Sequence, residues 1–202
     1  MKSLQAFAQD LSVMRHYIMV SAVLFAAGLT YGLGSDALDV LMLGQLEPLR
    51  DAAEQIDRME NTQLWLFLFI FFNNFVKSIL VVLLGALFGI FPVIFLVING
   101  MLIGYVVSLA AETGGNIFDL VVRGLLPHGL LELTAIVIAA AYGLKYGVLV
   151  LGGLFSMMKG EGRGGLFRAF HGSLKRLVPF LFLALLLAAF IESTVTYFLV
   201  RG

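Results

Sequence analysis

Long apolar runs separated by short polar segments dominate the pattern of this chain. A helix needs about 20 mostly apolar residues, at a rise of about 1.5 Å each, to cross a hydrocarbon core of about 30 Å. By this measure the chain holds five transmembrane spans, predicted near residues 17–34, 64–88, 92–112, 128–153 and 177–200. We therefore expect an all-α, polytopic membrane protein, in which five transmembrane helices form a compact bundle with short amphipathic surface helices. Residues 1–202 form a single integral membrane domain in this interpretation.

The second and third spans come from one apolar stretch, residues 64–111, which is too long for a single helix. Proline disfavours a helical conformation in the residue before it. The sequence Gly89-Ile90-Phe91-Pro92 is therefore the predicted break, and a tight hairpin joins the two spans.

Two further segments show apolar residues at helical spacing on an otherwise polar background. Near the N-terminus they are Leu4, Phe7, Leu11 and Met14; after Pro48 they are Leu49, Ala52, Ala53, Ile56 and Met59. This pattern is typical of a helix that lies on a surface with one apolar face. A frayed end remains an alternative for the first segment. The second is either a docking face for an extracytoplasmic partner or a solvated cap on the bundle.

Composition agrees with a membrane protein, and the charge distribution indicates its orientation. The chain is 60% hydrophobic and 13% charged, with a mean hydropathy of +0.99. Its net charge of zero gives no reason to expect a nucleic acid partner. The loop 154–176 holds five basic residues and one acid, whereas the loop 35–63 is rich in acids. Because basic loops stay in the cytoplasm, we expect a cell-membrane protein with a cytoplasmic N-terminus, an outer loop 35–63 and an external C-terminus.

Polar residues inside the apolar spans are the main candidates for function. Such groups are costly in hydrocarbon, so they face the bundle interior, a cavity or one another. We predict that they form an intramembrane polar stripe, and they are Asn73, Asn74, Lys77, Asn99, His128, Glu132 and Glu192.

Glycines recur in the spans at a spacing of four residues, which lets helix backbones approach closely. The pairs are Gly28 with Gly32, Gly85 with Gly89, Gly100 with Gly104 and Gly143 with Gly147. They predict close helix packing inside the chain, or a homodimer face built from one of the pairs.

The entry to the fourth span reads LLPHGLLEL, and Pro127, His128, Gly129 and Glu132 form its helix-entry motif. Proline suits the first turn of a helix, and Gly129 is expected to leave room for a neighbour. His128 and Glu132 have a spacing that can hold a metal, but a metal site needs a third ligand. The other histidines, at positions 16 and 171, are expected at the opposite membrane face. We therefore predict no metal, no cofactor and, without a nucleophile or HExxH motif, no catalytic residue.

Three stretches together resemble the stage II sporulation protein M family of multi-span membrane proteins. They are FFNNFVKSILVVLLGALFG with Asn73, FPVIFLVINGMLIG with Asn99 and Gly100, and PHGLLEL with Pro127, His128, Gly129 and Glu132. The resemblance covers all five spans. It implies a five-span helical protein without an established enzymatic activity. In spore formers the family is similar to a scaffold that holds two peptidoglycan-degrading partners at the membrane, and it assigns these residues no catalytic role.

Two functions remain open. One is a non-enzymatic membrane scaffold that recruits other envelope proteins through the acidic outer loop, with the lipid bilayer as its environment. The other is a small transporter or channel in which the polar stripe lines a path. Five spans are few for a transporter, so this second function would require a homodimer.

Overall fold

The computed structural model describes residues 2–34, 39–158 and 164–196, and these residues contain helices but no β-strand. Five of the helical regions are long and apolar enough to cross a membrane, which confirms the all-α, five-span prediction. In chain order the elements are α1 (Lys2–Gly32), α2 (Asp39–Asp57), α3 (Thr62–Leu84), α4 (Ile90–Glu112), α5 (Ile117–Asp119), the π-helical η2 (Leu120–Leu125), α6 (Leu126–Met158), α7 (Gly164–Ile191) and the π-helical η3 (Glu192–Thr196).

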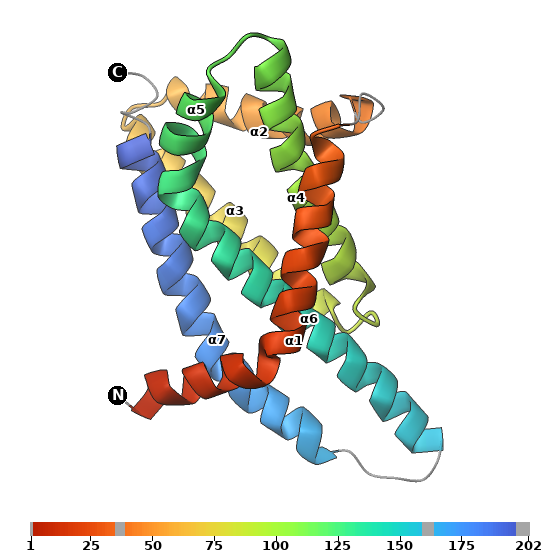
Figure 1. The fold of residues 1–202 in the computed structure, drawn as a ribbon. Helices are drawn as coiled ribbons and strands as arrows, with labels where there is room; N and C mark the ends of the chain where they lie inside the picture. Colours follow the sequence, from red (N-terminus) through yellow and green to blue (C-terminus); the bar gives the residue numbers. More distant parts are fainter. Residues whose placement is uncertain (1, 35–38, 159–163, 197–202) are drawn as a thin grey trace.

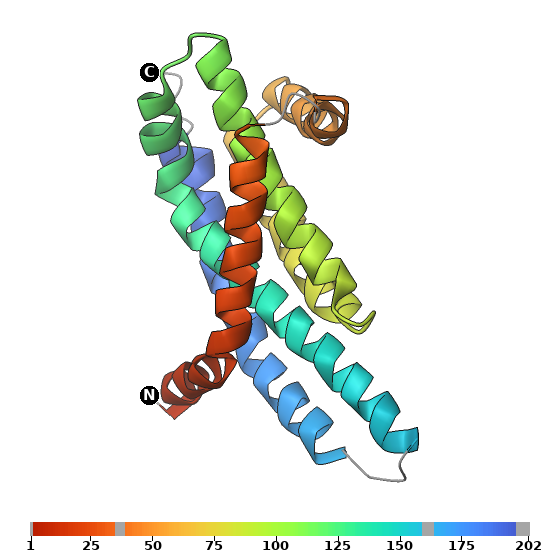
Figure 2. The same ribbon diagram turned by 45° about the vertical axis from the view of Figure 1, so that its right-hand side comes forward.

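Helices α1, α3, α4, α6 and α7 run alongside one another in an elongated bundle, and α6 and α7 extend furthest toward one end (Figures 1 and 2). At the opposite end α2 lies across the bundle, near the connection from α4 to α5. We call this the acidic end, because α2 carries Glu47, Asp51 and Glu54. The last turns of α6 and the first turns of α7 form the other end, which we call the basic end. The first turns of α1 lie across the bundle near this end. The α3–α4 turn points toward this end too.

The predicted hairpin between the second and third spans is present. Helix α3 ends at Leu84, and α4 begins at Ile90. Gly89 has a φ of 76° and Phe88 a φ of 58°, so two successive residues adopt the left-handed conformation that reverses the chain. Pro92 lies in the first turn of α4, where its missing N–H leaves no helical hydrogen bond unmade.

Both amphipathic segments are helical. The apolar face of the first turns of α1 packs on α7, where the rings of Phe7 and Phe180 lie 5.0 Å apart. Next to this contact, Arg176 of α7 donates two hydrogen bonds to the carboxylate of Asp10, at 2.5 and 2.9 Å. These two contacts hold the start of α1 against α7. A frayed end is therefore excluded for these residues.

Helix α2 buries Met42 and Ile56 on its bundle side. It begins at Asp39 rather than near Pro48, so the expectation that this proline opens the helix is wrong. Pro48 cannot donate a hydrogen bond to the carbonyl of Gly44. Gly44 is exposed, so water can pair with that carbonyl and the helix continues.

Two helical regions extend beyond the boundaries predicted for their spans. The helical region of the fourth span begins at Ile117 rather than at residue 128. The predicted loop 154–176 is helical wherever the structure describes it, in the end of α6 and the start of α7. Hydropathy marks where a helix enters hydrocarbon, not where the helix ends. The 33 residues of α6 measure about 50 Å, well beyond the membrane core of about 30 Å.

Two helix crossings depend on glycine. Where α1 crosses α4, a Cβ added at Gly28 would lie 2.3 Å from the carbonyl oxygen of Val97. A Cβ at Gly100 would lie 2.2 Å from that of Phe25. One turn along, Gly32 and Gly104 make the same kind of contact with the opposite backbone. Real Cβ atoms do not approach so closely, so only glycine permits this crossing.

The second crossing joins α3 and its following turn to α6. A Cβ added at Gly85 would lie 2.2 Å from the carbonyl oxygen of Gly143, and one at Gly147 would lie 2.2 Å from the backbone nitrogen of Gly89. Each of the four glycine pairs therefore meets another pair of the same chain. The alternative in which one of them forms a homodimer face has no support here, because its surface is already covered.

Prediction for the crossings. Replacing Gly100 by Ala forces α4 away from α1, and overpacking of this kind costs about 1–3 kcal/mol. We expect a lower free energy of unfolding, measured by denaturant titration in detergent micelles. The matched control is Gly172→Ala in α7, where an added Cβ meets nothing within 4 Å. That control should be neutral or stabilising, because alanine favours helix over glycine. Equal stability of Gly100→Ala and wild type would contradict the crossing geometry.

Candidate functional site

A cavity of about 760 Å³ lies near the acidic end and is lined by residues from α1, α2, α3, α4, η2, α6 and η3. Its walls are mostly apolar leucine, isoleucine, valine and phenylalanine side chains. Five residues of the predicted polar stripe also line it, namely Asn73, Asn74, His128, Glu132 and Glu192. These side chains therefore face the bundle interior.

Three of these residues form a compact cluster, His128, Glu132 and Glu192, which we call the His–Glu–Glu cluster. One potential ligand atom from each residue lies within 4.8 Å of those of the other two. His128 Nε2 and Glu192 Oε2 lie 3.7 Å apart. The His128 side chain is 10% exposed and that of Glu192 30% exposed, so both contact the cavity while most of their surface is covered.

Unusual helix geometry positions the cluster. His128 and Glu132 lie one turn apart at the start of α6, directly after the π-helical segment η2. Glu192 is the first residue of the second π-helical segment, η3, at the end of α7. π-helical turns are rare, and they occur frequently at functional sites. Such a turn changes the direction in which the following side chains point, so the directions of His128 and Glu132 depend on the π-helical turn that precedes them.

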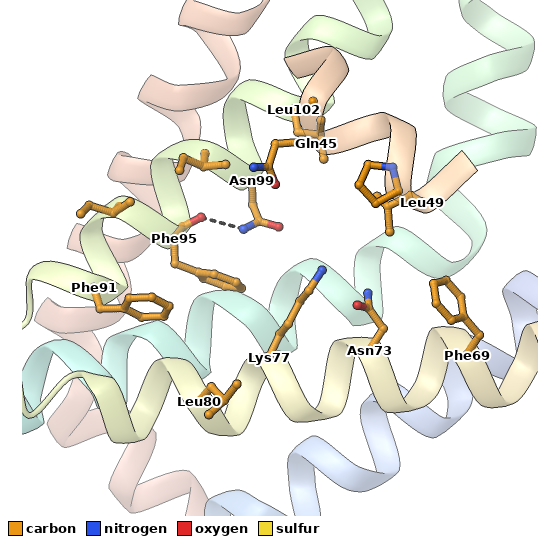
Figure 3. Close-up of a pocket in the computed structure, with 14 residues that line it drawn as sticks. Gln45, Leu49, Phe69, Asn73, Lys77, Leu80, Phe91, Phe95, Asn99 and Leu102 are labelled. Carbon is orange, nitrogen blue, oxygen red and sulfur yellow. Dashed lines mark hydrogen bonds between the residues drawn. The ribbon is translucent and has the colours of Figure 1, made fainter. Parts of the chain in front are cut away.

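A second cavity, of about 590 Å³, lies between α3 and α4, with part of α2 over one end. Figure 3 shows Lys77 and Asn73 of α3 directed into this space, and Asn99 directed into it from α4. Asn99 donates its side-chain hydrogen bond to the carbonyl oxygen of Phe95 at 2.7 Å. Asn73 donates to the side-chain oxygen of Asn74 at 3.2 Å.

The two cavities adjoin, because Leu49, Phe69, Asn73 and Leu102 line both of them. Lys77 in one cavity lies within electrostatic range of Glu132 in the other, although the two side chains form no direct ion pair. All seven residues of the predicted stripe therefore line one of two adjoining cavities, with Asn73 between the two charged regions.

Neighbouring residues of the sequence motifs, Asn99 with Gly100 and the helix-entry residues, make different contacts. Asn99 faces the cavity, while the next residue, Gly100, contacts α1. Pro127 is the second residue of α6, but the helical region begins ten residues earlier at Ile117, so the expectation that this proline lies in the first turn of a helix is wrong. Gly129 differs from its expectation: a Cβ added there would meet nothing within 4 Å, so no neighbour in the described chain needs the space. It lines the larger cavity instead.

The sequence argument against a metal site counted only histidines as third ligands, and so it missed Glu192. Within residues 2–34, 39–158 and 164–196, the His–Glu–Glu cluster is the one group of His, Asp or Glu side chains close enough to share an ion. His16 lines a separate hollow beside Gly89, far from this cluster. Glu132 lies near the start of the predicted fourth span and Glu192 near the end of the predicted fifth, so both are expected toward the same membrane face, and this signal could have paired them.

Comparison with known proteins gave one family match. The model of a family described as stage II sporulation protein M matches residues 21–197, a region that includes all of the polar stripe and the helix-entry motif. Neither the curated proteins nor the solved structures contained a match.

Prediction for the charged residues. Replacing Lys77 by Met leaves the Glu132 charge without its cation, so it should destabilise wild type more than it destabilises a Glu132→Gln protein. A double-mutant cycle of unfolding free energies in micelles should give a coupling of about 0.5–3 kcal/mol. Lys145→Met is the control, since Lys145 lies 13 residues from Glu132 along α6, about 20 Å away. Its effect should add to that of Glu132→Gln. If the effects of Lys77→Met and Glu132→Gln on the unfolding free energy also simply add, the two charges do not interact.

Proposed function

Because this chain belongs to the stage II sporulation protein M family, we propose that it is a non-enzymatic membrane scaffold that organises other envelope proteins. The observation that carries this proposal is the arrangement of α2. Its acids Glu47, Asp51 and Glu54 follow one another at helical spacing and are all exposed, and Glu54 pairs with Arg50 at 2.9 Å. Its other face packs on the bundle through Met42, which joins Met101 and Tyr105 in a small buried cluster.

This arrangement suits recruitment for a physical reason. A rigidly attached helix with an acidic outer face presents fixed charge, which attracts and orients a basic partner surface. A cap that only shielded the bundle would need the apolar face of α2 but not the run of acids on the opposite face. We therefore assign protein partners with basic surfaces to the acidic end.

The orientation follows from the basic end. Arg168 and Lys175 lie exposed in the first half of α7. Positive residues near the ends of transmembrane helices are retained in the cytoplasm. We propose a multi-pass protein of the cell membrane with the N-terminus in the cytoplasm, α2 on the outer face and the C-terminus outside.

Prediction for recruitment and orientation. The chain has no cysteine, so a single introduced cysteine carries a unique label. Glu47→Cys and Met157→Cys both change exposed residues, in α2 and in the basic-end part of α6 respectively. The cells are intact but have no outer-membrane barrier. We expect a membrane-impermeant thiol reagent that carries a photo-crosslinker to react at position 47 and not at position 157. Illumination should then join the position-47 protein to a specific partner.

Charge reversal supplies the control for that crosslink. Asp51→Lys combined with Glu54→Lys keeps the helix but removes the acidic face, so the crosslinked product should disappear while labelling at position 47 persists. Labelling at position 157 alone would reverse the proposed orientation. A labelled position 47 that yields no partner, or the same product after charge reversal, would contradict recruitment by this face.

A second candidate function is favoured by the two adjoining cavities, which carry Lys77 and Glu132 inside the membrane domain. Charged groups along a cavity are typical of proteins that carry a proton or a small solute across the bilayer. A dimer is the form in which five spans per chain would supply such a path. This candidate needs no partner at the acidic end.

Prediction that separates the two functions. In liposomes of the purified protein, a scaffold should give proton flux equal to that of protein-free vesicles, because its polar residues only stabilise the bundle. A proton-coupled carrier should give flux above that level, and Glu132→Gln should abolish it because the amide cannot ionise. Flux in wild type that Glu132→Gln removes would overturn the scaffold proposal in favour of the second candidate.

A further inference from the structure

The geometry points to a divalent transition-metal site of the Zn²⁺ type in the membrane domain, formed by His128, Glu132 and Glu192. This inference does not depend on whether the protein is a scaffold or a carrier. It reverses the expectation that the sequence supports no metal, because α7 and η3 return to α6 and add a carboxylate that lies 60 residues beyond Glu132 in the chain.

The donor set decides the class of ion. One imidazole nitrogen with two carboxylates suits Zn²⁺ and its neighbours among the transition metals. Mg²⁺ and Ca²⁺ prefer six or more oxygen ligands and do not favour imidazole. Zn²⁺ bonds of about 2.0–2.2 Å in a tetrahedral site place ligand atoms about 3.3–3.6 Å apart. The 3.7 Å between His128 Nε2 and Glu192 Oε2 is already close to this spacing.

To complete the three-ligand geometry, the carboxylate of Glu132 has to move toward the ion. All three ligand atoms lie within 4.8 Å of one another, so closure around an ion needs movements of about 1 Å. Glutamate has three side-chain torsions, and the cluster borders a cavity rather than tightly packed atoms. The same cavity leaves space for a fourth ligand, a water molecule or a group of a bound solute, as in zinc sites with three protein ligands.

Charge balance supports an additional cation. Two carboxylates in a mostly apolar cavity are costly unless positive charge compensates them. Lys77 of α3 interacts with Glu132 and can offset one of them. Arg123 of η2 pairs with Asp119 at 3.4 Å and is 58% exposed, so it is directed to a different acid. Asn73 and Asn74 add dipoles but no charge. The Glu192 carboxylate is compensated either by a proton, which the His128 imidazole 3.7 Å away can carry, or by a metal ion that both side chains bind.

The backbone supplies an independent observation. Both chain segments that carry the cluster contain a π-helical turn, η2 just before His128 and η3 beginning at Glu192. A π-helical turn is rare and occurs frequently at functional sites. Two such turns converge on three potential ligands in this part of the bundle.

The test uses the full chain, purified in detergent without a histidine tag and stripped with a chelator. Equilibrium dialysis against Zn²⁺, with the metal measured by mass spectrometry, should give one equivalent per chain. Co²⁺ in its place should give the intense visible bands of a four- or five-coordinate site. Zn²⁺ should also raise the unfolding temperature of the stripped protein.

Variants distinguish this site from adventitious binding. Glu192→Gln retains the size and hydrogen-bonding capacity of the side chain but weakens it as a ligand, so the bound equivalent, the Co²⁺ bands and the thermal shift should all be lost. His128→Ala should give the same losses. His16→Ala and His171→Ala change the other histidines and should retain all three signals.

Glu192→Gln keeps the proposal falsifiable if His128→Ala does not fold. Wild-type protein that binds no Zn²⁺ would overturn the site. So would a bound equivalent that survives in Glu192→Gln, because the ion would then lie elsewhere. Six-coordinate Co²⁺ spectra without intense bands would exclude the proposed three-ligand geometry.

Discussion

Direct contact between helix backbones, made at glycines, is the interaction on which this bundle depends. Gly28 and Gly100 bring α1 and α4 together, and Gly85 and Gly143 do the same for α3 and α6. Lipid tails are as apolar as leucine, so the hydrophobic effect supplies little attraction between helices inside the bilayer, and close packing must supply it. The consequence is that α4 packs chiefly on α1, while α3 packs chiefly on α6 and α7. Although a tight turn joins α3 to α4, the two touch each other little, and the space between them becomes a cavity.

The polar side chains occupy the space that this packing leaves. Hydrocarbon offers no hydrogen-bond partners, so an asparagine, lysine or glutamate in a span must find them within the protein. Asn99 uses a carbonyl of its own helix, Asn73 uses Asn74, and Lys77 lies within electrostatic range of Glu132. The Glu192 carboxylate reaches His128 because the end of α7 returns to the start of α6. The residues predicted to form one polar stripe thus line two adjoining cavities.

The amphipathic helices connect these cavities to the surface. At the basic end, the start of α1 is joined to α7 by the Asp10–Arg176 ion pair and by the Phe7–Phe180 contact. At the acidic end, α2 carries the exposed acids on one face and contributes Leu49 to both cavities on the other. A helix is about 10–12 Å across. A protein bound to the acidic face would therefore lie only one helix diameter from the polar interior.

Sequence alone determined the class of the protein, the five spans, the α3–α4 break and the polar side chains that line the two cavities. These follow from local quantities: hydropathy over a helix length, an apolar run too long for one helix, and the cost of Asn73 or Glu132 in hydrocarbon. The break itself lies at Phe88 and Gly89, because Phe91, the residue before Pro92, is already helical. Only the tertiary structure decided that Gly28 faces Val97 rather than a second copy of the chain, that α6 and α7 continue beyond the membrane core, and that Glu192 meets His128. Helical periodicity specifies the face of a helix on which a residue lies. Which helix lies opposite depends on crossings between segments far apart in the chain, and no local pattern contains that information.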